Sequence, residues 1–203
     1  MALTVFTRTY ELSDFDKREI LRYAGVKRDG GVTDELLNVL RECIDAVQGK
    51  LSLKVCWCEL PVRCEGDVVR LGEVTLTSHS LSRVLDGCDG AVVFAATVGI
   101  ELDRLIARSS CTSQARALML DAIGAERIES LCEAFCEDMK KEKSEVRPRF
   151  SPGYGDLPLD TQRSIFALLD CHKRIGLSLN ESLLMSPSKS VSAIVGVCNK
   201  ERE

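Results

Sequence analysis

The chain has 203 residues, of which 45% are apolar and 29% are charged, with 14 glycines, 5 prolines and 10 cysteines. This composition is typical of a globular protein and excludes a disordered or collagen-like chain. Cysteines this widely spread do not form the framework of a small secreted protein, so we expect reduced thiols in the cytoplasm. The net charge of −4, without a basic cluster, argues against nucleic acid as a partner.

The sequence predicts neither a signal peptide nor a membrane-spanning helix. The first residues, Met-Ala-Leu-Thr-Val-Phe-Thr-Arg, lack a basic segment followed by a long apolar core. The longest apolar run, Ala91–Val98, is far shorter than the roughly 20 residues that a helix needs to cross a bilayer. We therefore expect a soluble, cytoplasmic protein with no membrane partner.

Residues 1–50 are interpreted as an N-terminal helical region. A short helix is expected over Phe15–Gly25, with Asp14 as its N-cap. A stronger helix begins after Thr33 and ends at Gly49. Its apolar stripe consists of Leu36, Leu37, Leu40, Cys43, Ile44 and Val47.

The pattern changes to strands at Leu51. From there apolar residues alternate with polar ones, which predicts a half-buried strand that further short strands continue. Breaks at 65–67 and at Gly72 make an antiparallel meander the simplest arrangement. A short helix is expected at Ser80–Leu85, and Ala91–Thr97 is apolar enough for a strand that is covered on both faces.

Two helices follow, at Gly99–Arg108 and at about Thr112–Lys141. The segment Arg147–Pro158 contains three prolines and two glycines, which exclude a helix and predict a loop. A helix at about Asp160–Asp170 and a strand at Ser190–Val197 complete the chain.

Helices and antiparallel strands are mixed without a regular βαβ alternation, so the predicted class is α+β, an antiparallel or mixed sheet with flanking helices. We divide the chain into residues 1–50 and an α+β region, 51–203. A single continuous domain over residues 1–203 is the alternative.

The long helix carries a carboxylate, Glu129, at the centre of an apolar face, and Glu133 lies at the edge of that face. The face is formed by Leu118, Ala122, Ala125, Cys132 and Cys136. A carboxylate there is costly unless it is paired or exposed in a cleft, so both glutamates are candidates to meet a cationic or hydroxyl-bearing ligand. The alternative is an internal salt bridge. The candidate partners are Arg104, Arg116 and Arg127.

The loop that follows the long helix is the second candidate site. Proline rigidity beside glycine permissiveness brings backbone groups close to a ligand. Arg149 could clamp a carboxylate, and Tyr154 could stack on a flat ring or donate its hydroxyl. The alternative is that these residues only connect two helices tightly.

The cysteines and histidines predict no metal site and no catalytic residue. The cysteines lack CxxC spacing and a nearby histidine, so we expect them to pack as small apolar side chains. His79 and His172 have no serine or cysteine nucleophile at a recognisable spacing, and no phosphate-binding GxxxxGK or GxGxxG pattern occurs.

Three segments in series resemble the activation domain of vitamin B12-dependent (cobalamin-dependent) methionine synthase. Arg149–Tyr154, Arg-Phe-Ser-Pro-Gly-Tyr, resembles its RPxPGY segment. Glu129–Phe135 is similar to its acidic helix segment, and 175–192 resembles its closing helix, turn and strand. The resemblance covers about Asp121–Val197 and is nearest to short, stand-alone relatives with Pro-Gly-Tyr-Gly-Asp. The larger domain continues after Pro-Gly-Tyr with Pro-Ala-Cys, where this chain has Gly-Asp-Leu.

This resemblance implies a stand-alone module that binds S-adenosylmethionine and supports reductive reactivation of a corrinoid on a separate protein. That partner would be a cobalamin-dependent methionine synthase or a related methyltransferase, with a flavodoxin or ferredoxin-type protein as reductant. By position, Arg149 would hold the methionyl carboxylate, and the glutamates would face the positive part of the ligand. The implied ligand-binding residues are Glu129, Glu133, Arg149, Ser151, Pro152, Gly153 and Tyr154.

One difference from the family supports a second interpretation. Ile194 and Val195 stand where the family has an aromatic ligand contact shortly after Ser-Val-Ser. The alternative is therefore a binding-only accessory protein or chaperone of a corrinoid methyltransferase, with a degenerate ligand pocket. A free-standing methyltransferase with a small acceptor is the third hypothesis.

Overall fold

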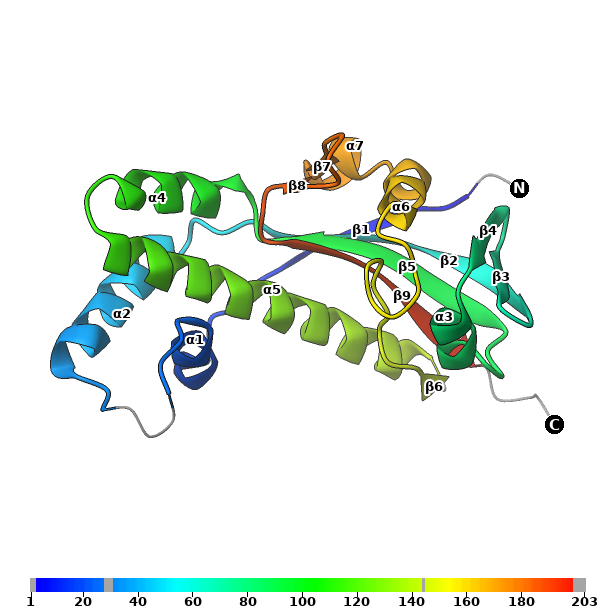
Figure 1. The fold of residues 1–203 in the computed structure, drawn as a ribbon, viewed down its shortest axis with the longest axis horizontal. Helices are drawn as coiled ribbons and strands as arrows, with labels where there is room; N and C mark the ends of the chain where they lie inside the picture. The colour runs from blue at the N-terminus through cyan, green and yellow to red at the C-terminus, as the bar shows by residue number, and fades with distance from the viewer. Residues whose placement is uncertain (1–2, 28–30, 144, 199–203) are drawn as a thin grey trace.

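The computed structural model describes residues 3–27, 31–143 and 145–198. Its centre is an antiparallel sheet of strand order β4-β3-β2-β5-β9-β6, in which β1 pairs with the first part of β2 (Figure 1). A separate ribbon is formed by β7 and β8. The strands are β1 (Phe6–Tyr10), β2 (Leu53–Glu65), β3 (Val68–Leu71), β4 (Val74–Thr77), β5 (Gly90–Thr97), β6 (Glu145–Val146), β7 (Ser178–Leu179), β8 (Met185–Ser186) and β9 (Ser190–Cys198).

Helices cover both faces of this sheet (Figure 1). The 29-residue α5 lies along one face, with α1, α2 and α4 packed against it. The other face is covered by α3, α6 and α7. The helices are α1 (Lys17–Tyr23), α2 (Asp34–Val47), α3 (His79–Val84), α4 (Ile100–Ser110), α5 (Gln114–Glu142), α6 (Thr161–Leu169) and α7 (Cys171–Ile175). Among the residues that the structure describes, no helix combines the length and the apolar character needed to cross a membrane.

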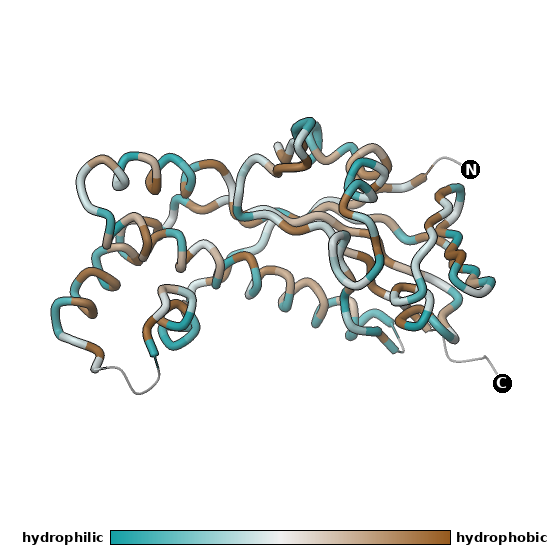
Figure 2. The backbone as a smooth tube through the Cα atoms, viewed as in Figure 1, coloured by the Kyte–Doolittle hydropathy of each residue, from teal (hydrophilic) through white to brown (hydrophobic). Residues whose placement is uncertain are grey.

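The central strand β5 is buried on both faces, as its unbroken apolar sequence predicts. Val92 and Phe94 point into the core beside α5, where the Phe94 ring lies 4.8 Å from that of Phe135. Val93 and Ala95 alternate with them and belong to the second core, beneath α6 and α7. Figure 2 shows the hydrophobic residues concentrated along these central strands. The α+β class with an antiparallel sheet and flanking helices is confirmed.

The first 50 residues contain a strand as well as the two predicted helices. Ile20 of α1 and Leu40 of α2 share the core on the α5 side with the sheet. The strand β1 pairs with β2 from Phe6 opposite Trp57 to Tyr10 opposite Leu53. The side chains of β1 are exposed or only partly buried. A strand without a buried face needs no alternation of apolar and polar residues, so the sequence did not predict β1.

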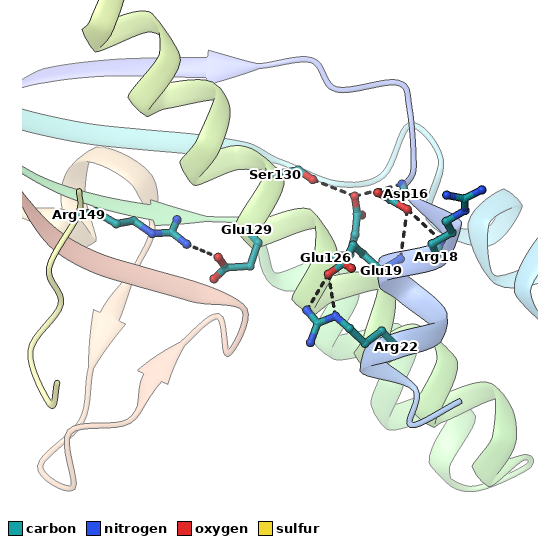
Figure 3. A network of polar contacts seen from close by, with 8 residues as sticks. All are labelled: Asp16, Arg18, Glu19, Arg22, Glu126, Glu129, Ser130 and Arg149. Carbon is teal, nitrogen blue, oxygen red and sulfur yellow. Dashed lines mark hydrogen bonds and ion pairs between the residues drawn. The ribbon is translucent and has the colours of Figure 1, made fainter. Parts of the chain in front are cut away.

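A buried ion pair on α5 holds the segment between β1 and α1. Arg127 and Glu126 are 1% and 3% exposed, and their side chains pair at 2.5 Å. Arg127 also donates to the backbone carbonyls of Leu12 and Asp14. Figure 3 shows Glu126 accepting from the backbone N–H of Asp16. These bonds offset the cost of burying two charges and fix the chain where it enters α1.

The same contacts explain where α1 begins. The predicted cap was Asp14, but the N-cap is Asp16, whose Oδ1 accepts from the N–H groups of Arg18 and Glu19 at 2.9 and 3.1 Å (Figure 3). The carbonyl of Asp14 is bound by Arg127, so the chain turns into the helix two residues later. Thr33 caps α2, as predicted, through its hydroxyl and the N–H of Leu36.

Candidate ligand-binding site

The loop between β6 and α6 crosses the edge of the sheet from the α5 side to the α6 side (Figure 1). Its first half is fixed to β9, because Phe150 and Ile194 exchange two backbone hydrogen bonds of 2.8 Å. The N–H of Arg147 also donates to the carbonyl of Gly196 at 2.9 Å. The predicted loop is therefore an ordered edge of the sheet rather than a free connection.

The second half of the loop is held by Asp156. Its Oδ1 accepts from the Ser78 hydroxyl at 2.6 Å and from the N–H of Ser80 at 3.0 Å, and its Oδ2 accepts from the N–H of His79 at 2.7 Å. The Ser78 hydroxyl, together with the two N–H groups, holds the pKa of this carboxyl well below its usual range. Gly155 is also required, because its φ is +56° and a Cβ would lie 2.7 Å from the Ser80 hydroxyl oxygen. The Gly-Asp pair after Pro-Gly-Tyr thus anchors the loop to the start of α3.

A cavity of about 380 Å³ lies between α5, the loop, α6 and the first residues of β9. Its volume is within the range of small-molecule sites. The residues that line it are Glu129, Arg149, Phe150, Ser151, Pro152, Tyr154, Gln162, Met185, Ser190, Val191 and Ser192.

Two predicted site residues, Arg149 and Glu129, form an ion pair at this cavity. Arg149 Nη2 from the loop donates to Glu129 Oε2 from α5 (Figure 3). Their side chains are 28% and 37% exposed, so the pair is open to solvent and to a ligand. The two candidate sites that the sequence suggested separately are therefore one site.

The alternative prediction for Glu129, an internal salt bridge, is confirmed by its pair with Arg149. The predicted partners were wrong, because each of those arginines pairs with another carboxylate. Arg104 pairs with Glu101 on α4, Arg116 with Glu42 on α2, and Arg127 with its neighbour on α5. The loop brings its own arginine to Glu129 instead.

Three buried polar atoms at the cavity lack a hydrogen-bond partner within the described chain: Arg149 Nη1, Gln162 Oε1 and Ser192 Oγ. Of the described side chains, one other has such an atom, Arg147 Nε. A buried polar group without a partner costs about 1–3 kcal/mol, so such groups are rare unless a ligand or water satisfies them. Because all three belong to residues that line one cavity, this cavity is the candidate binding site.

The free edge of β9 adds backbone groups to the same cavity. On its outer side, β9 is covered by β6 and by the Phe150 bridge from Ile194 onward. No strand in the described ranges pairs with this side of β9 before Ile194. Because hydrogen-bonding direction alternates along a strand, the N–H and C=O of Ser192 face the same edge as those of Ile194.

The predicted site residues do not all reach the cavity. Glu129, Arg149 and the segment 151–152 line it, together with Tyr154, which is 69% exposed at the mouth. Gly153 is not a lining residue; its φ of +89° and the hydrogen bond from its N–H to the carbonyl of Leu157 form the turn.

Glu133 is exposed on α5 and is not a lining residue. Ile194 and Val195 are fully buried in the two cores and do not face the cavity. Leu118, at the start of the apolar face of α5, is 54% exposed, so this face is buried only from Ala122 onward.

The sequence did not identify the far wall of the cavity, which α6 and β9 provide. The sequence did not predict that Gln162 is buried, because nothing in the first turn of a helix distinguishes a buried glutamine from an exposed one. The Ser-Val-Ser segment was part of the family resemblance but was not predicted to line a site. Its serines line the cavity at Ser190 and Ser192.

The cysteines next to the site are neutral thiols. Burial raises the pKa of the Cys132 thiol to about 12, although Arg149 lies close by. Within the described residues, no three His, Cys, Asp or Glu side chains are grouped so that they could hold a metal ion. The cavity itself is lined by an ion pair and by uncharged polar and apolar groups.

The loop and the last strand match a known family, and the whole fold matches a solved structure. Residues 144–202 match the family described as "Vitamin B12 dependent methionine synthase, activation domain". The whole chain is similar to the MetH reactivation domain whose crystal structure was determined with bound AdoHcy, with a TM-score of 0.71 and 18% sequence identity. The similarity covers 99% of this chain and 80% of that one. No curated protein matches the chain. The family match thus confirms the resemblance for the loop and the last strand, and the structural similarity confirms the expected fold.

Proposed function

We propose that this chain binds S-adenosylmethionine in the cavity and supports reductive remethylation of a corrinoid on a separate protein. The partner would be a cobalamin-dependent methionine synthase or a related methyltransferase. The observation that carries this proposal is the open Arg149–Glu129 pair beside unpartnered buried polar atoms. The family match and the similarity to an AdoHcy-bound reactivation domain support the choice of ligand.

The ion pair suits the amino-acid end of such a ligand. Arg149 Nη1 is free to take a carboxylate, which an arginine binds in a two-pronged geometry. Once Arg149 turns to the ligand, Glu129 is free to accept from the ligand's ammonium group. Two ion pairs with the ligand thereby replace the Arg149–Glu129 pair, so binding leaves neither charge without a partner.

The reaction needs a methyl donor, an electron and a corrinoid. An electron from a flavodoxin or ferredoxin-type protein reduces cob(II)alamin to cob(I)alamin. The cobalt of cob(I)alamin then forms a bond to the methyl carbon of S-adenosylmethionine, the carbon–sulfur bond breaks, and its electron pair stays on sulfur. The products are methylcobalamin and S-adenosylhomocysteine. In this scheme the chain needs no catalytic acid or base, because its residues bind and orient the methyl donor.

Two features support a corrinoid held outside this fold and a reducing compartment. The similarity to the reactivation domain accounts for 99% of the chain, so the corrinoid must come from another domain or protein. All ten cysteines are free thiols, as is typical of a reducing compartment.

A binding-only accessory protein of a corrinoid methyltransferase is the alternative. It is favoured by Ile194 and Val195, which are core residues where the family has an aromatic ligand contact. The unpartnered atoms of Gln162 and Ser192 argue against it. Burying polar atoms without partners costs stability, and a pocket that no longer binds a ligand gains nothing to offset that cost.

Calorimetry with S-adenosylmethionine tests the proposal. We expect saturable binding that weakens roughly tenfold or more in Arg149→Ala, since a charge-assisted hydrogen bond contributes about 1.5–3 kcal/mol. Arg104→Ala is the matched control, because it also removes an arginine from a carboxylate, but on α4. No saturable heat at millimolar ligand would overturn the ligand assignment.

A further inference from the structure

We propose that Gln162 and Ser192 determine ligand specificity by binding the vicinal hydroxyl groups of a ribose. This inference rests on the proposed function and deepens it, because it assigns the nucleoside part of the ligand to the wall formed by α6 and β9. It makes the cavity selective for a nucleoside-linked amino acid over a free amino acid.

Both residues are buried, yet each has an unpartnered side-chain atom. Gln162 is 8% exposed and Ser192 is 2% exposed. Gln162 Oε1 and Ser192 Oγ lack a partner within the described ranges, and both residues line the cavity. Neither atom contributes a hydrogen bond to the described fold, so burying both costs stability.

The neighbouring Ser190 shows what a structural serine looks like at this strand. Its hydroxyl bonds to Thr97 Oγ1 at 2.9 Å and to the carbonyl of Pro187 at 2.8 Å. Ser192, two residues further on the same face of β9, has no such bond. The difference marks Ser192, and not Ser190, as available to a ligand.

The residues that line the cavity differ in charge. Arg149 from the loop and Glu129 from α5 are charged, whereas Gln162 from α6 and Ser192 from β9 are uncharged. A glutamine oxygen only accepts, and a serine hydroxyl both donates and accepts. Two adjacent hydroxyl groups satisfy both, because one donates to Gln162 Oε1 and the other exchanges a hydrogen bond with Ser192 Oγ.

The test compares two probes by calorimetry, S-adenosylhomocysteine and its 2′,3′-dideoxy analogue. We expect the wild-type chain to bind the first at least about tenfold more tightly, the effect of one or two lost hydrogen bonds. In the double variant Gln162→Met, Ser192→Ala, this preference should fall below about twofold. Ser190→Ala, the control, should keep the full preference.

Thermal unfolding without ligand separates this role from a structural one. Because Gln162→Met removes an unpartnered acceptor, its Tm should equal or exceed that of the wild type, whereas loss of a structural hydrogen bond would lower it. If the wild type binds S-adenosylhomocysteine and the double variant keeps the tenfold preference, the inference is wrong and the proposed function stands. If the wild type binds neither probe, both are overturned.

Discussion

Arg149 and Glu129 are 20 residues apart in the sequence and meet as an ion pair (Figure 3), and both line the cavity. One comes from a loop fixed to β9, and the other from the middle of α5. The pair therefore joins two parts of the structure and also occupies the charges that we assign to the ligand. Binding would exchange a contact within the protein for contacts with the ligand.

Glu129→Gln should weaken S-adenosylmethionine binding about tenfold, because the ligand's ammonium group loses a charged acceptor. Glu133→Gln is the matched control, one helical turn away on the exposed side of α5, and its affinity should stay within about twofold. Calorimetry of both variants gives the comparison. Equal weakening by the two substitutions would show that Glu133 also binds the ligand.

Asp156→Asn should lower the Tm at neutral pH, because the Asp156 carboxylate accepts three hydrogen bonds that hold the loop. The folded-state pKa is depressed, so this stabilisation is present above the unfolded pKa of about 3.9 and is lost as the pH falls toward the folded value. The Tm difference between wild type and variant should therefore shrink between about pH 4 and pH 2. Asp160→Asn is the control, since Asp160 makes no side-chain cap bond to α6. A Tm difference independent of pH would contradict the assignment.

Arg127→Met should destabilise the fold by about 3–5 kcal/mol, because it leaves Glu126 buried and without its counter-charge. Arg22→Met removes the arginine of an exposed pair with Glu19 (Figure 3) and should cost less than about 1 kcal/mol. Urea unfolding of the two variants measures the difference. Similar small losses in both would show that the buried pair does not anchor the N-terminal segment.

Gly155→Ala should destabilise the loop and weaken ligand binding. The positive φ alone costs about 1–2 kcal/mol for a residue with a Cβ, and here the Cβ would also crowd Ser80. Gly176→Ala isolates the first effect, because its φ is +70° and its Cβ would meet open space. Chemical unfolding should show a larger loss for Gly155→Ala, and ligand affinity should fall only in that variant.

The sequence predicted the parts of the fold that local chemistry determines. Prolines and glycines marked the loop, and an unbroken apolar run predicted the doubly covered β5. The strand β1 was missed because an exposed edge strand has no apolar face to reveal it. The cap of α1 was misplaced because a distant arginine, Arg127, binds the carbonyl of the expected cap residue.

For the site, the sequence identified the charged residues but not how they combine. A helical wheel placed Glu129 on an apolar face, yet its partner depends on the path of the loop, which the Phe150–Ile194 bridge sets across the sheet edge. Gln162 and Ser192 were missed for another reason. Their significance lies in hydrogen bonds that the fold does not provide, and this can be judged only when all neighbours are placed.

The most direct test of the central claim is reconstitution. The purified chain is mixed with a cob(II)alamin-loaded methionine synthase, a reductant and S-adenosylmethionine, and the visible spectrum is followed. We predict conversion to methylcobalamin that requires both S-adenosylmethionine and the chain and is strongly slowed by Arg149→Ala but not by Arg104→Ala. A spectrum that stays that of cob(II)alamin with the wild-type chain, or an Arg149→Ala variant as active as the wild type, would contradict the account.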